Sequence, residues 1–176
     1  MSEIGHPAAA TTEMGSAAAA ARQSIEQLLK LLDIDEVTRR HGQQLWEILA
    51  PSIDAVLDVF YQKLVHAHVE PLLSDGPTIV RLKRQQKAHW ASLFNSQFDE
   101  RYINRVQRMG VRHVDVGLRL RHYVAAYMLL KIEFANVIVR TDLCALTKGL
   151  QIKTLDKYVA LDMAIALSSY DVTIVD

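Results

Sequence analysis

The stretch that decides the fold is residues 105–118, RVQRMGVRHVDVGL, which has the pattern of a helix closing on a histidine. Tyr102, Val106, Met109 and His113 are spaced four, three and four residues apart. At 3.6 residues per turn they form one continuous stripe, so His113 is predicted to face the interior at the end of an apolar helix face. A histidine in such a place can present a neutral imidazole nitrogen to a pocket, which is what an iron or zinc ion requires.

Outward from this stretch, helical periodicity continues through most of the chain, and no convincing strand run interrupts it. Residues that typically begin helices separate the periodic segments, and Gly117 is expected to end the helix of His113. These starting residues are Asp33 or Asp35, Pro51, Pro77 and Asp99. The sequence therefore predicts an all-α fold of about seven to eight helices, with a short extra N-terminal helix from Arg22. The two longest helices are expected at residues 118–139 and 143–172.

The chain has 176 residues, half of them hydrophobic, which is enough for one well-filled core. Residues 1–21 are mostly Ala, Thr, Ser and Gly and are predicted to be a disordered leader. We therefore expect one domain, over residues 22–176.

Composition disfavours several classes of protein. Lys and Arg number 20 and Asp and Glu number 20, so no bulk positive charge favours nucleic acid. The glycine motifs of nucleotide-binding loops are absent, and a single cysteine, Cys144, excludes an internal disulfide. We find no signal-peptide pattern and no apolar run of the roughly 20 residues that a membrane span needs. These features favour a soluble, cytoplasmic protein.

Seven histidines are candidates for chemistry, but no HExxH motif and no helical pair three or four apart supports a two-histidine zinc site. His89 shares a stripe with Leu82, Gln86 and Leu93, so it is also expected to face inward. For His89 and His113 alike, the alternative is a core histidine with a hydrogen-bonded ring. Periodicity alone does not separate the two residues.

The local sequence around His113 does separate them, because it resembles the globin domain of bacterial globin-coupled sensors, a family of haem-based oxygen sensors. Members typically have an apolar helix, a histidine, three residues, a glycine and an aliphatic residue. An aromatic–tyrosine pair follows about ten positions after the histidine. Here these positions hold His113, Gly117, Leu118 and His122–Tyr123. His122 stands where a tryptophan is more usual. The resemblance extends over about residues 24–172.

The resemblance implies a globin-like fold that binds haem b, with His113 as the ligand of the iron. It further implies that Tyr123 hydrogen-bonds His113, and that Tyr61 of the pair Phe60–Tyr61 points at the opposite, distal face. Leu82 and Gln85 match the family's distal helix, although some members have threonine or a small residue at Gln85. Further walls of the pocket would include Val106, Met109 and Val116. His89 as a second axial ligand is a weaker alternative.

The implied function is a gas sensor, not an enzyme. With one strong axial ligand the other side of the iron stays open to O2, CO or NO. Tyr61, and after it Gln85, is expected to donate a hydrogen bond to bound O2. Basic residues can pair with haem propionates or simply form a solvated helix face. They are Arg101, Arg105, Arg108 and Arg112.

Family members typically regulate a diguanylate cyclase, a histidine kinase or a chemotaxis transducer, and a linked or interacting output domain of this kind is the expected partner. A homodimer through the last two long helices would carry the signal, with Gly110 and Gly117 allowing the ligand helix to shift. Two other functions remain open. One is a stand-alone globin or protoglobin that handles O2 or NO, and the other is a haem-free, globin-like signalling module.

Overall fold

The structure, a computed structural model, describes residues 22–68 and 75–170, which form helices and turns without a strand. The predicted leader at residues 1–21, the middle of the expected connection at 69–74 and the end of the chain at 171–176 lie outside the described residues. After a helix at residues 22–31 come α2 (Glu36–Leu49), the 3-10 turn η1 (Ala50–Ser52), α3 (Ile53–His66), α4 (Gly76–Phe94), α5 (Glu100–Asp115), α6 (Leu120–Val139) and α7 (Ala145–Leu167). The predicted all-α fold is confirmed.

Aspartates begin three of these helices, because each carboxylate accepts a hydrogen bond from an otherwise unpaired backbone N–H. Asp35 accepts from the N–H of Thr38 at 2.8 Å, and Asp99 from that of Tyr102 at 2.9 Å. Asp75 does the same for α4, whose first turn contains Pro77 as expected. Pro51 lies in the short 3-10 turn before α3 instead of in α3 itself.

The end of α5 is fixed by Gly117, whose φ of +76° lies in the left-handed region that favours glycine. The N–H of Gly117 donates to the carbonyl of Val114 at 2.8 Å, and the N–H of Leu118 donates to that of His113 at 2.9 Å. This pair of bonds is the Schellman motif that often closes a helix. The predicted stop after His113 is therefore present, and the backbone at His113 is held by it.

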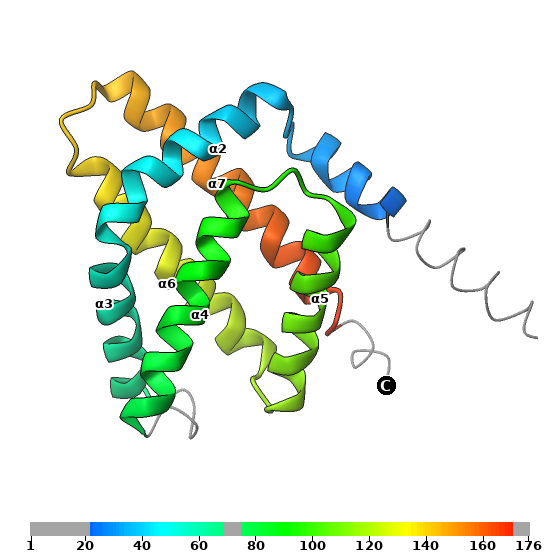
Figure 1. Ribbon diagram of the computed structural model, residues 1–176, viewed down its shortest axis with the longest axis vertical. Coiled ribbons are helices and arrows are strands. Elements are labelled where there is room, and N and C mark those ends of the chain that lie inside the picture. Colours follow the sequence, from blue (N-terminus) through cyan, green and yellow to red (C-terminus); the bar gives the residue numbers. More distant parts are fainter. Residues whose placement is uncertain (1–21, 69–74, 171–176) are drawn as a thin grey trace, which may run out of the picture.

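Two helices, α6 and α7, form a layer on which the others lie (Figure 1). α7 packs against α2, α5 and α6, while α3 packs against α4 and α6. α4 and α5 run in opposite directions, joined by a turn at residues 95–99. The beginning of α4 and the end of α5 therefore lie at the same end of the molecule (Figure 1). Near the turn the two helices are joined by a hydrogen bond from Arg105 of α5 to Ser92 of α4.

An aromatic cluster fills the centre of the core. Trp90, Phe94, Phe134 and Tyr158 are fully buried, and the ring of Trp90 meets that of Phe134 at 4.9 Å between centroids. The Trp90 indole N–H donates to the side chain of Gln86 at 2.9 Å, so its polar atom is satisfied. This cluster ties α4 to α6 and α7.

By length and composition α6 is apolar enough to cross a membrane, contrary to the expectation that no such segment exists. Its tyrosines Tyr123 and Tyr127, together with Phe134, are nevertheless buried against neighbouring helices. These residues form the buried side of α6, while most of its apolar window is not buried within the chain.

Candidate functional site

His113 lies in the last turn of α5, partly buried, and its Nδ1 atom is buried without a hydrogen-bond partner. A buried polar atom left unpaired is uncommon and calls for an explanation. Burial lowers the pKa of His113, and the nearby His89 lowers it further. The ring is therefore neutral at pH 7 and can act as a ligand through a nitrogen lone pair.

The stripe predicted on α5 faces the interior. Tyr102 and Val106 are buried, and Met109 packs against the core while remaining partly exposed. Val116 does not belong to this face, because it follows the last turn of α5 and is 50 % exposed. Val106, Met109 and Val116 were predicted to line the pocket near His113. The structure places only Val106 and Met109 on the inward face of α5.

The ring of Tyr123, from α6, lies against the ring of His113. The two ring centroids are 5.1 Å apart, and the Tyr123 hydroxyl is also buried without a hydrogen-bond partner. Burial, and after it the negative charge of Asp162, raise the pKa of Tyr123, so the hydroxyl keeps its proton.

The predicted distal residues come from α3 and α4. Phe60 and Tyr61 are buried, with ring centroids 5.1 Å apart in an edge-to-face contact. Burial raises the pKa of Tyr61, which therefore remains a proton donor at neutral pH. Leu82 is partly buried against the core, whereas Gln85 is exposed. The neighbouring Gln86 is the glutamine that turns inward.

Residues 21–173 match the model of the protoglobin family. The chain belongs to the protoglobin family. Its fold is also similar to that of solved globin domains. The globin domain of the Geobacter sulfurreducens globin-coupled sensor is 19 % identical, with a TM-score of 0.72 over 82 % of this chain and 96 % of that one. The globin domain of E. coli DosC has a TM-score of 0.70 in its ferric form and 0.69 in its ferrous form. These two structures are 19 % and 18 % identical and cover 85 % and 83 % of this chain and 99 % of each DosC chain. The expected globin-like fold is confirmed.

Within this protoglobin-family fold, His89 is held in the core by a hydrogen-bonded ring. Its Nε2 atom lies 2.8 Å from Oδ2 of Asp162, which is fully buried in α7. The hydroxyls of Tyr102 and Tyr127 also donate to Asp162. With Nε2 engaged in this way, His89 matches the alternative of a core histidine more closely than that of a second axial ligand.

The cluster around Asp162 was not predicted from the sequence. Its one sequence signal is a carboxylate on an otherwise apolar stripe, since Leu155, Val159, Asp162 and Ala166 recur at helical spacing. A buried carboxylate needs partners, and these come from three other helices.

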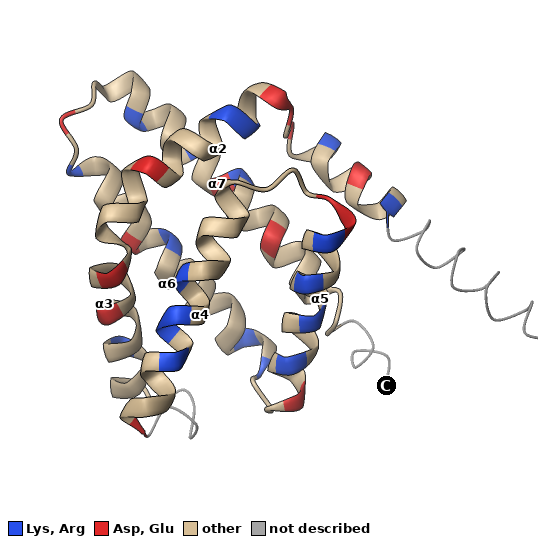
Figure 2. Cartoon of the chain, in the orientation of Figure 1, with Lys and Arg blue, Asp and Glu red and all other residues tan. Residues whose placement is uncertain are grey.

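Basic side chains gather on α4 and α5 of this protoglobin (Figure 2). Lys83 and Lys87 of α4 are paired with Asp58 and Asp54 of α3, at 2.6 and 2.7 Å. Arg105 donates to Ser92 and lies over the ring of Tyr102. Three further arginines of α5 are exposed and form no ion pair with the described residues. They are Arg101, Arg108 and Arg112.

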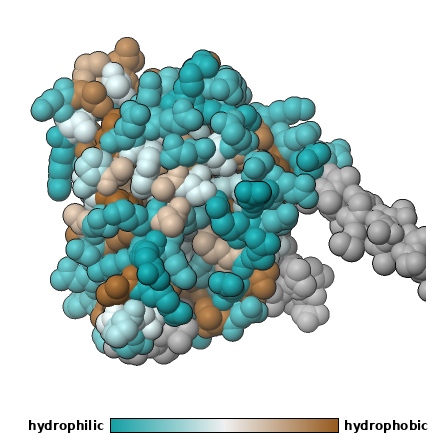
Figure 3. Space-filling view, viewed as in Figure 1, coloured by the Kyte–Doolittle hydropathy of each residue, from teal (hydrophilic) through white to brown (hydrophobic). Residues whose placement is uncertain are grey.

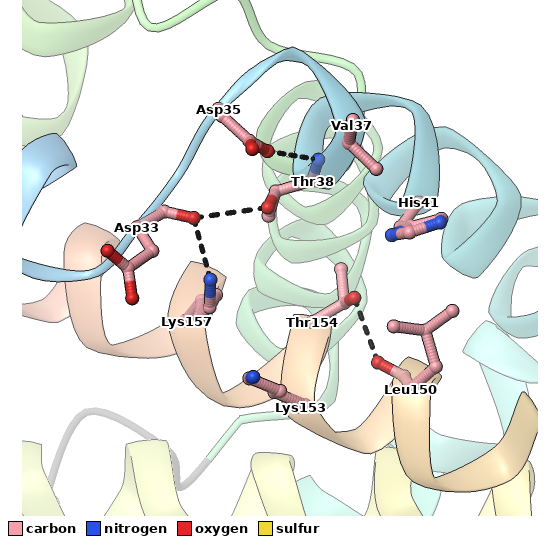
Figure 4. A pocket seen from close by; sticks show the side chains of 9 residues that line it. All are labelled: Asp33, Asp35, Val37, Thr38, His41, Leu150, Lys153, Thr154 and Lys157. Carbon is pink, nitrogen blue, oxygen red and sulfur yellow. Dashed lines mark hydrogen bonds between the residues drawn. The ribbon is translucent and has the colours of Figure 1, made fainter. Parts of the chain in front are cut away.

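A separate hollow of about 290 Å³ lies between the start of α2 and α7 (Figure 4). Its polar groups largely satisfy one another. The Lys157 ammonium and the Thr38 hydroxyl both donate to the carbonyl of Asp33, at 2.6 and 3.1 Å. None of the residues predicted for the site lines this hollow, which is formed by Asp33, Asp35, Val37, Thr38, His41, Leu150, Lys153, Thr154 and Lys157.

Proposed function

We propose that this protoglobin-family domain binds haem b through His113 and reversibly binds O2, and also CO and NO, as the input of a signalling output. The observation that carries the proposal is the neutral, buried imidazole of His113 with its unpaired Nδ1 beside the unpaired hydroxyl of Tyr123. Metal-bound histidines usually donate their second ring N–H to an oxygen acceptor. The residues present therefore fit a haem ligated at Nε2.

The walls support the same assignment. Val106 and Met109 on α5 and Phe60 and Leu82 on the opposite side offer apolar contacts for a flat porphyrin. When bound, the haem supplies an iron that takes up diatomic gases. Tyr61 is the donor we assign to the gas, because its hydroxyl is protonated and makes no hydrogen bond to the described residues. The exposed position of Gln85 favours Tyr61 over Gln85 in this role.

Exposed arginines are the partners we propose for the haem propionates. Arg108 and Arg112 project from the same helix as His113 and are not engaged by acidic residues that the structure describes. A guanidinium binds a carboxylate through two parallel hydrogen bonds. Arg105 is less suitable, since it is held by Ser92 and Tyr102.

The link between α5 and α7 supports transmission of a signal. The Ser169 hydroxyl donates to the carbonyl of Gln107 at 3.1 Å, and that of Tyr170 donates to the carbonyl of Leu118 at 3.2 Å. These bonds join α7 and the residues after it to both sides of His113. A displacement of His113 on gas binding would thus be passed to α7.

We propose that α6 and α7 form a homodimer interface. Only 28 % of the most apolar window of α6 is buried within one chain. Apolar side chains are exposed over the turn between the two helices, at the upper left of Figure 3. An exposed apolar surface of this kind typically marks an interface. The exposed residues are Ile132, Val139, Leu143, Leu146 and Leu150. We place the domain in the cytoplasm as a regulatory module, with any catalytic output carried by another domain or protein.

Gas binding is tested by the absorption spectrum of the purified, haem-loaded protein. We expect the Soret band of the reduced protein to shift on addition of O2 and, separately, of CO. A spectrum that neither gas alters would contradict the gas-binding proposal. Sedimentation of the same sample measures the oligomeric state. Leu146 is 85 % exposed in the single chain and would be buried in the proposed interface, so the charge in Leu146→Glu is expected to yield monomers.

A further inference from the structure

Asp162 is the only carboxylate among the described residues that is fully buried, and every hydrogen bond it accepts comes from a different helix. The donors are His89 of α4, Tyr102 of α5 and Tyr127 of α6. Burial alone would raise the pKa of Asp162, but His89 and the two tyrosines outweigh burial and hold it below its ordinary value. The carboxylate is therefore ionised at neutral pH in the middle of the domain.

A line of tyrosines leads from this charge to His113. Tyr127 donates to Oδ2 of Asp162, and its ring centroid is 5.1 Å from that of Tyr123. The ring of Tyr123 is in turn 5.1 Å from that of His113. The Tyr127 side chain lowers the pKa of Tyr123 against the larger, opposite effect of burial, so the two side chains interact, although the Tyr123 hydroxyl makes no hydrogen bond of ordinary geometry to a described residue. Tyr102 reaches the same carboxylate through Oδ1 but forms no part of this line.

We propose that Asp162 is a positioning residue for the proximal histidine, acting through Tyr127 and Tyr123 to strengthen the acceptor that faces Nδ1 of His113. A donor whose hydrogen bond ends on a carboxylate carries more negative charge on its own oxygen, so it becomes a better acceptor for the next group. At the end of the line, the Tyr123 oxygen draws the Nδ1 proton of His113 more strongly. The imidazole then becomes a stronger ligand through Nε2.

This inference rests on the proposed haem function. It adds Asp162, which does not itself contact His113, to the residues that tune the bond between His113 and iron. It predicts that breaking the line weakens the bond between His113 and iron and favours the ferrous state. Two matched substitutions distinguish an effect that passes along the tyrosine line from a general effect on the stability of the fold. Tyr127→Phe and Tyr102→Phe each remove one hydroxyl from the same carboxylate, but only Tyr127→Phe interrupts the path to His113.

The test measures the iron–histidine stretching frequency by resonance Raman spectroscopy and the reduction potential of the haem-loaded protein. For Tyr127→Phe we expect a lower frequency and a ferrous-to-ferric ratio about tenfold higher at a fixed potential, equivalent to ~59 mV. Tyr102→Phe is expected to leave both quantities close to those of the wild type. Asp162→Asn, which keeps the side-chain shape and removes the charge, is expected to match Tyr127→Phe.

Thermal unfolding of the haem-free proteins supplies the control, since both tyrosine substitutions should lower the Tm by similar amounts. Equal frequencies and potentials in Tyr127→Phe and Tyr102→Phe, whether both altered or both unchanged, would overturn the inference. If Asp162→Asn does not fold, the tyrosine pair still decides the outcome. A wild-type protein that takes up no haem would instead overturn the proposed function, which is a different result.

Discussion

The contact between α5 and α7 at Gly110 makes a quantitative prediction about what positions the helix of His113. A Cβ added at Gly110 would lie 2.3 Å from the carbonyl oxygen of Ala166 and 2.8 Å from Oγ of Ser169. The first distance is about 0.7 Å short of the 3.0 Å below which Cβ contacts are essentially never seen. The Ser169 side chain can rotate away, but the backbone at Ala166 cannot.

We therefore expect Gly110→Ala to push α5 away from α7. Overpacking of this kind costs about 1–3 kcal/mol. Replacing a helical glycine by alanine contributes an opposing gain of about 1 kcal/mol. The net expectation is a loss of stability of up to ~2 kcal/mol, which for a domain of this length lowers the Tm by about 2–4 °C per kcal/mol.

Gly149→Ala is the matched control. Gly149 also lies inside a helix, α7, but nothing lies within 4 Å of an added Cβ. Gly149→Ala should raise the free energy of unfolding by about 0.5–1 kcal/mol, the gain from replacing a helical glycine by alanine. Urea unfolding of the haem-free proteins measures both changes. If Gly110→Ala proved as stabilising as Gly149→Ala, the close approach of α5 to α7 would be refuted.

Two further predictions concern Tyr61 and Asp162. Tyr61→Phe removes a buried hydroxyl that has no partner among the described residues, so the haem-free protein should be no less stable than the wild type. O2 should dissociate faster from the haem-loaded variant, and an unchanged dissociation rate would move the donor role to another residue. Asp162 has a folded pKa below the value of about 3.9 expected in the unfolded chain. Its contribution to stability is therefore complete above about pH 5 and lost as the pH falls through the folded pKa. The difference in urea midpoint between wild type and Asp162→Asn should narrow from pH 6 to pH 3, and a constant difference would argue against an ionised, hydrogen-bonded Asp162.

The helix of His113 was predictable because its signals are local. The N-cap at Asp99, the apolar stripe and the stop at Gly117 all lie within one helix and its ends. Helical periodicity and capping are properties of neighbouring residues, so a single sequence carries them. The same holds for the all-α class.

Residues near helix ends and faces were harder to place. Val116 lies just past the last turn of α5, and a shift of one residue in the end of a helix decides whether such a side chain faces inward. Gln85 and Gln86 differ by about 100° around α4, and the structure turns Gln86 inward, where it accepts a bond from Trp90. The spacing that groups Gln86 with Leu82, His89 and Leu93 had placed Gln86 on the inward face, whereas Gln85 was proposed from the family resemblance.

The cluster at Asp162 could not be predicted because it depends on tertiary contacts. Its donors lie 73, 60 and 35 residues away along the chain, on α4, α5 and α6. A lone aspartate in an apolar helix indicates a buried polar site, but not which side chains meet it. The sequence therefore indicated the helix of His113 but not the hydrogen-bonded centre behind it.

The most direct test of the central claim is an absorption titration of the haem-free chain with haem, for the wild type and His113→Ala side by side. We predict that the wild type binds one haem per chain and develops a Soret band, whereas His113→Ala loses iron ligation. His89→Ala, as a second variant, should still ligate the iron, because His89 is held by Asp162. A wild-type chain that takes up no haem, or a His113→Ala variant with an unchanged spectrum, would contradict the assignment of His113 as the ligand.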